Sequence, residues 1–84
     1  MKNINPTNYN LHPRVKVLGK DKTIFIVIDR KSRIIMKDGY RIVKMAKQIN
    51  QVEVDKEVSV LSRAPVCKKT KKFLLENHIV VKSL

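Results

Sequence analysis

The sequence contains one cysteine, no tryptophan and only two glycines among its 84 residues. The single thiol, Cys67, has no partner for an internal disulfide and no second cysteine for a zinc site, which favours a reducing compartment. With Gly19 and Gly39 as the only glycines, a glycine-rich phosphate loop is excluded. His12 and His78 lie at opposite ends of the chain, so we expect no metal site and no cofactor.

Long hydrophobic stretches are also missing. The longest apolar run covers residues 24–28, whereas a membrane-spanning helix needs about 20 apolar residues. The first nine residues contain no apolar segment of the kind found in secretion signals. We therefore expect a cytoplasmic protein that does not act at membranes.

Acidic residues are scarce. The chain has 7 Asp and Glu against 19 Lys and Arg, which leaves a formal net charge of +12. A hydrophobic content of 43% is enough for one small core, and the length favours a single domain. Such an excess of positive charge favours an anionic partner, and nucleic acid is the partner class that it fits best. A solvated, lysine-rich surface is the alternative.

The N-terminal segment differs from the rest of the chain. Residues 1–13 contain four asparagines, Pro6 and Pro13, and they show no apolar periodicity, so we expect an extended or flexible arm. Residues 14–84 form the predicted domain. There, residues 15–18 and 23–28 read as two strands joined by a turn, because both are rich in β-branched residues. The continuous apolar run of the second strand predicts a central place in the sheet.

The remaining elements alternate between helices and strands. Residues 33–36 are predicted to form a third short strand, and a helix is expected to follow from about Lys37 to residue 51, with Asp38 capping its first turn. A strand at 58–62, a helix at 66–77 and a strand at 79–82 complete the chain. The predicted class is α/β, in the order β-β-(β)-α-β-α-β, with a mixed sheet of four or five strands and two packing helices.

Basic residues are concentrated in the two helices and in the segment before the first helix. Lysines fill the first turns of the second helix, where each cation costs about 0.3–1 kcal/mol, so local stability does not explain them. We expect largely sequence-independent binding to the phosphates of DNA or RNA. The residues predicted to make these contacts are Arg30, Lys31, Arg33, Arg41, Lys44, Lys68, Lys69 and Lys72.

Other side chains give weaker indications. The four aromatic residues are too few and too scattered for a base-stacking platform of the RRM or OB type. Cys67 opens the second predicted helix beside two lysines, where a thiol can become reactive. A buried structural role is the alternative for Cys67, as is anion capture by the neighbouring backbone N–H groups.

One arrangement resembles the core of the PD-(D/E)XK nucleases, which include archaeal junction resolvases. It consists of residues 13–17, residues 26–31, and a strand and helix that lead through residues 71–77 to the last strand. The resemblance implies metal-dependent nucleic-acid cleavage, with Asp29 and Lys31 as the acid and the lysine of the motif. Arg14 stands where the family has its first acid, and the nearest other acid, Asp21, lies in a turn.

A protein-interaction role is the third hypothesis. Residues 52–57 contain three of the seven acids, and they would complement the basic helices of another molecule or of a second copy. The first strand of the hairpin would support a homodimer if it lay at the edge of the sheet.

Overall fold

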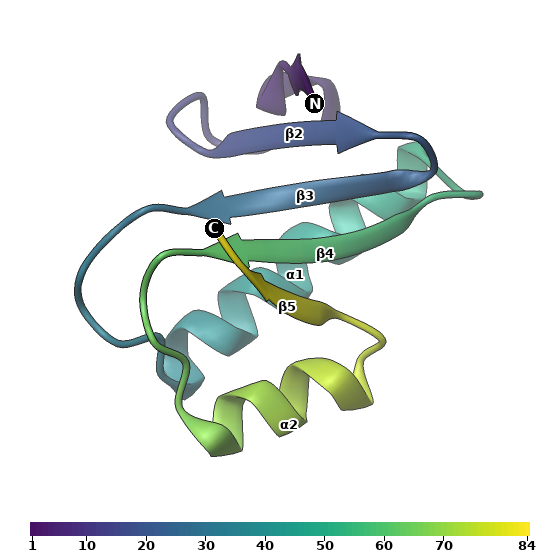
Figure 1. Cartoon of the computed structure of the whole chain (residues 1–84). Coiled ribbons are helices and arrows are strands. Elements are labelled where there is room, and N and C mark those ends of the chain that lie inside the picture. Colours follow the sequence, from purple (N-terminus) through teal and green to yellow (C-terminus); the bar gives the residue numbers. More distant parts are fainter.

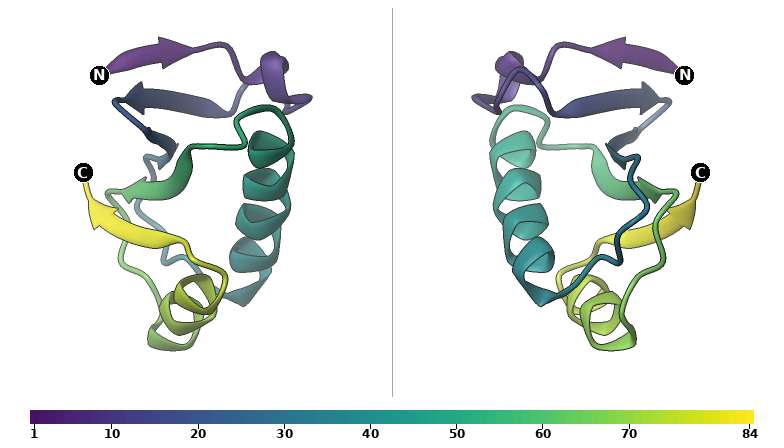
Figure 2. Two further views of the ribbon diagram at one scale, coloured as in Figure 1. Left: turned by 90° about the vertical axis from the view of Figure 1, so that its right-hand side faces the viewer. Right: turned by 90° about the vertical axis from the view of Figure 1, so that its left-hand side faces the viewer.

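A five-stranded sheet with two helices on one side forms the protein, as Figures 1 and 2 show. This computed structural model describes residues 1–84. Across the sheet lie, in chain order, β1 (Lys2–Ile4), β2 (Lys16–Lys20), β3 (Thr23–Ile28), β4 (Glu57–Ser62) and β5 (Val80–Ser83). The first three strands are antiparallel, and β3, β4 and β5 are parallel. The predicted α/β class, mixed sheet and two helices are confirmed.

The β2–β3 hairpin forms where the sequence predicts it. Asp21 in its turn has φ 54°, in the left-handed region that tight hairpin turns use. Val17 pairs with Ile26, and both side chains are buried in the core between sheet and helices. The predicted central position of β3 is confirmed, because β2 and β4 flank it.

Helix α1 (Met36–Val52) packs its apolar stripe on the sheet. Ile42, Ala46 and Ile49 recur at helical spacing and are buried. The cap is made by Asp38, whose Oδ2 accepts a hydrogen bond from the Ile35 backbone N–H at 3.0 Å. Asp38 therefore caps the helix as predicted, but from its first turn, and the negative charge also complements the helix dipole.

The second helix, α2 (Lys68–Glu76), buries Thr70 and Leu74. Contact between the two helices is close at Gly39, where an added Cβ would lie 3.1 Å from Thr70 Cγ2. Glycine therefore suits this position because of the neighbouring helix rather than because of a special backbone conformation. Neither helix has the length and apolar character needed to cross a membrane.

The predicted third strand at residues 33–36 is not formed. Only Ile34 pairs there, in a single parallel bridge with Val66, and Met36 already begins α1. Within this apolar segment Ile34 is fully buried, whereas Ile35 is exposed. The segment therefore contributes one buried side chain and not a strand of the sheet. The fifth strand of the sheet comes instead from the N-terminal segment.

Residues 1–13 pack against the domain rather than extending from it as an arm. β1 pairs with β2, and the 3-10 helix η1 (Pro6–Tyr9) follows it. Tyr9 and Leu11 are only 3% and 6% exposed, and two anchors at this spacing leave no periodic signature in the sequence. β2 is therefore not an edge strand, and the homodimer pairing expected through it is not open to it.

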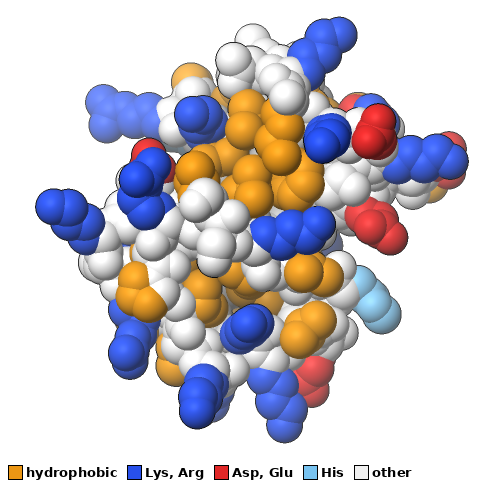
Figure 3. All heavy atoms as spheres, in the orientation of Figure 1, with side chains coloured by type: hydrophobic (Ala, Val, Ile, Leu, Met, Phe, Trp, Pro, Cys, Tyr) orange, Lys and Arg blue, Asp and Glu red, His pale blue; other side chains and the backbone are white.

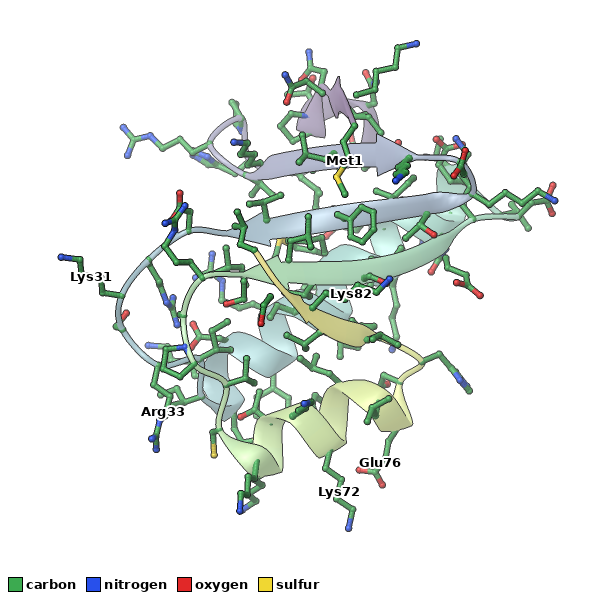
Figure 4. The ribbon with its side chains drawn as sticks, viewed as in Figure 1. Met1, Lys31, Arg33, Lys72, Glu76 and Lys82 are labelled. Carbon is green, nitrogen blue, oxygen red and sulfur yellow. The ribbon has the colours of Figure 1, made fainter.

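The sheet face opposite the helices has no covering layer (Figure 2). Phe25 lies on this face and outside the helix-side core cluster, yet it is only 5% exposed. The Lys82 Nζ lies 5.7 Å from the centre of its ring, and Figure 4 shows Met1 and Lys82 on this face. The long side chain of Lys82 thus lies over the ring on a face without a second layer.

Tyr9 provides a test of how the N-terminal segment is anchored. Its hydroxyl donates to Glu53 Oε2 at 3.0 Å, and burial, together with this carboxylate, raises its pKa to about 12. The unfolded pKa is about 10, so this contribution to stability is complete below pH 10 and is lost as the pH rises through 12. We expect Tyr9→Phe to lower the free energy of unfolding by about 1 kcal/mol at pH 7.

Urea unfolding of both proteins from pH 7 to pH 12 measures this effect. The difference in unfolding free energy between the native chain and Tyr9→Phe should shrink between pH 10 and 12. A difference that stays constant over this range would show that the buried phenol does not carry the pH dependence.

Candidate nucleic-acid interface

The carboxyl ends of the parallel strands define one side of the molecule. β3 ends at Ile28 and β4 at Ser62, and these two residues are paired. The helices α1 and α2 begin at the same side (Figure 1), because each must return along the sheet before the next parallel strand. We call this side the carboxyl edge, formed by residues 14–16, 29–35 and 63–67 and the first turns of both helices. Crevices in α/β sheets commonly bind ligands at such an edge.

Backbone hydrogen bonds join the two loops of the carboxyl edge. The Ile34 N–H donates to the Pro65 carbonyl at 2.9 Å, and the Cys67 N–H donates to the Ile34 carbonyl at 3.0 Å. Arg30 donates to the backbone oxygens of Ser32 and Arg33 within its own loop. These contacts fix the backbone of the two loops and the side chain of Arg30.

Most of the predicted basic residues lie at this edge. Lys31 and Arg33 are exposed and extend into solvent from the loop after β3 (Figure 4). Lys68 and Lys69 begin α2, close to the same loop, and Arg30 and Arg41 line a groove beside it. Space-filling Figure 3 shows basic side chains along this side of the molecule.

Two predicted residues are not part of this group. Lys44 lies in the middle of α1 and does not line the groove. Lys72 extends away from the sheet on the outer side of α2 (Figure 4). Both remain exposed, and the positions of the helices separate them from the loops of the carboxyl edge.

Three further basic residues belong to the edge, although the sequence analysis did not select them. Arg14 and Lys16 precede and begin β2, and Lys16 pairs with Val27 near the end of β3. Arg63 follows β4 directly. The hairpin pattern in the sequence could have identified Arg14 and Lys16, because an antiparallel strand starts beside the end of its partner.

The acids at the carboxyl edge are neutralised by arginines. Arg30 binds Asp38 at 2.6 Å, and Arg63 binds Asp29 at 2.8 Å. The Arg30 hydrogen bond is the main cause that lowers the pKa of Asp38, so this carboxylate is ionised at neutral pH. Four of the remaining acids lie at the opposite end of the strands, around the β2–β3 turn and the loop before β4: Asp21, Glu53, Asp55 and Glu57.

The structure does not assemble the metal ligands that the nuclease resemblance implies. Asp29 is held by Arg63, and Lys31 extends into solvent. Nowhere do three or more His, Cys, Asp or Glu side chains gather in a way that would hold a metal ion. Arg14, at the position of the family's first acid, adds positive charge to the same edge.

Cys67 is the N-cap residue of α2 and is half-buried. The nearby backbone N–H groups of Thr70 and Lys69 lower the pKa of its thiol, and Arg33 contributes in the same direction. N–H groups and a cation near the sulfur favour its thiolate form. A lowered pKa is what the reactive role of Cys67 requires.

Alkylation measures this property, because Cys67 is the only thiol in the chain. The rate of reaction with iodoacetamide follows the thiolate fraction, so its pH midpoint reports the thiol pKa. We expect a lower midpoint in the folded protein than in the same protein unfolded in urea. An equal or higher midpoint in the folded protein would contradict the lowered pKa of this thiol.

Comparisons with known proteins do not assign a role to this edge. No protein family, no curated protein and no solved structure matches the chain.

Proposed function

We propose that this protein binds nucleic acid through phosphate contacts made by the carboxyl edge. The supporting observation is the convergence of basic side chains from separate chain segments on one edge, where both acids are already ion-paired. A solvated surface would not require this separation of charge, since spreading lysines evenly reduces their mutual repulsion.

Counterion release supplies the affinity in this mechanism. Each phosphate that a lysine or arginine neutralises frees condensed cations from the nucleic acid. For about six contacts on duplex DNA, the logarithm of the binding constant should fall with the logarithm of salt concentration with a slope of roughly −5. Lysines bind phosphate as point charges and arginines with two N–H groups, so both types serve this purpose.

Sequence readout has little basis in this arrangement. The basic side chains lie on loops and on the first turns of helices, and neither helix protrudes from the domain as a recognition helix (Figure 2). Phosphate contacts position a protein on nucleic acid but carry no sequence information directly. We therefore expect similar affinities for unrelated sequences of the same polymer.

Charge reversal at the edge tests the proposal. The variant Lys31→Glu with Arg33→Glu changes two exposed side chains that make no ion pairs. The matched control, Lys20→Glu with Lys22→Glu, makes the same charge change at the β2–β3 turn, on the opposite end of the strands. Fluorescence anisotropy with labelled duplex DNA, single-stranded DNA and a structured RNA, at several salt concentrations, compares the variants.

The edge variant should bind at least about tenfold more weakly, with a salt slope less steep by about 2, because two phosphate contacts are lost. The control should retain most of the native affinity. Equal losses of affinity in the two variants would show that net charge alone, and not the carboxyl edge, determines binding. An absence of binding by the native protein at low salt would refute the proposal.

The nuclease alternative differs from this proposal in a direct assay. It requires cleavage that depends on Mg²⁺ or Mn²⁺ and disappears in Asp29→Ala. Binding without catalysis predicts intact nucleic acid with either metal, and an affinity for Asp29→Ala at least equal to the native one, since a negative charge is removed. Metal-dependent cleavage abolished by this substitution would favour the nuclease.

A further inference from the structure

A groove with a volume of about 350 Å³ opens beside the carboxyl edge, between α1, the start of β2 and the end of β3. Helix α1 packs against β4 and against η1, and the groove lies where its first turns face the start of β2 and the end of β3. The groove thus lies between sheet and helix, next to the loop that carries Lys31 and Arg33.

The charge around the groove favours an anion. Four basic residues line it, Arg14, Lys16, Arg30 and Arg41. Of these, Arg30 is held by Asp38, whereas Arg14 and Arg41 are exposed and form no ion pair. Asp29, the other acid that lines the groove, forms an ion pair with Arg63. Two guanidinium groups therefore remain available for one anionic group.

The walls of the groove favour an apolar body attached to that anion. Val15, Ile28 and Met45 line it, are half-buried and pack on the hydrophobic core. Ile26 and Ile42 lie beneath them and are almost fully buried, so this wall is rigid. An inorganic anion would leave this apolar surface wet, whereas a ligand with a flat ring would cover it.

We propose that the groove binds one unpaired nucleotide of a single-stranded segment, an inference that rests on the proposed function. The base and sugar pack against Val15, Ile28 and Met45, and the phosphate contacts Arg14 and Arg41. The volume lies at the small end of the range for ligand sites, about 300–1,000 Å³, which limits the occupant to about one nucleotide. A base within a duplex stays stacked and cannot enter without leaving its helix.

Neutralising Arg41 tests the groove, with Lys44→Gln as the matched control. Both positions lie on α1, both are exposed, and only Arg41 lines the groove. The probes are a labelled single-stranded DNA and a labelled, covalently closed circular DNA duplex, which contains neither ends nor unpaired loop nucleotides. Thermal unfolding of each variant first establishes that the fold is intact.

Arg41→Gln should weaken single-strand binding by about tenfold, as expected for one charge-assisted contact, and closed-duplex binding by much less. Lys44→Gln should affect both probes slightly and equally. Thymidine 5′-monophosphate should displace the single strand from the native protein at a concentration at least about fivefold below that of inorganic phosphate.

The outcomes separate the two proposals. If Arg41→Gln and Lys44→Gln reduce binding to both probes equally, or if phosphate competes as well as the nucleotide, the groove inference is overturned and phosphate binding by the edge stands. If the native protein binds neither probe at low salt, the proposed function fails, and the groove inference fails with it.

Discussion

The parallel pairing of β3 with β4 is the constraint on which the rest of the structure depends. The pairing runs from Thr23 with Glu57 to Ile28 with Ser62, so both strands end at the same side. Parallel neighbouring strands cannot be joined by a tight turn. The chain therefore returns along one face of the sheet as α1 before it enters β4. The same constraint applies to β4 and β5, and it places the start of α2 next to the start of α1 (Figure 1).

This geometry concentrates charge. The segments that follow β3 and β4 are rich in arginine and lysine, and the Ile34–Val66 bridge holds them side by side. Like charges brought together in this way repel one another. The pairs Arg30–Asp38 and Arg63–Asp29 offset part of this repulsion, but Lys31, Arg33, Lys68 and Lys69 have no such partner. The unneutralised charge is the basis for the proposed binding of phosphates.

Local patterns explain why much of the fold was predictable. The β2–β3 hairpin and the buried stripes of both helices follow from side-chain periods that neighbouring residues establish. The prediction of a strand at residues 33–36 was wrong because a short apolar run has the same local pattern whether it forms a strand or buries only one side chain, here Ile34. The packing of the N-terminal segment was not predictable from local patterns, because Tyr9 contacts Gln48 in α1 and Glu53 after it, far along the chain.

The sequence by itself determined the α/β class, the basic character of the surface and most of the residues that face solvent, because these properties depend on composition and local period. Only the tertiary structure decided which basic residues meet. It brought Arg14 to Arg41 across the groove and separated Lys44 and Lys72 from the edge. The physical reason is that a solvated side chain leaves no apolar period in the sequence, so its neighbours are set by strand order and helix placement alone.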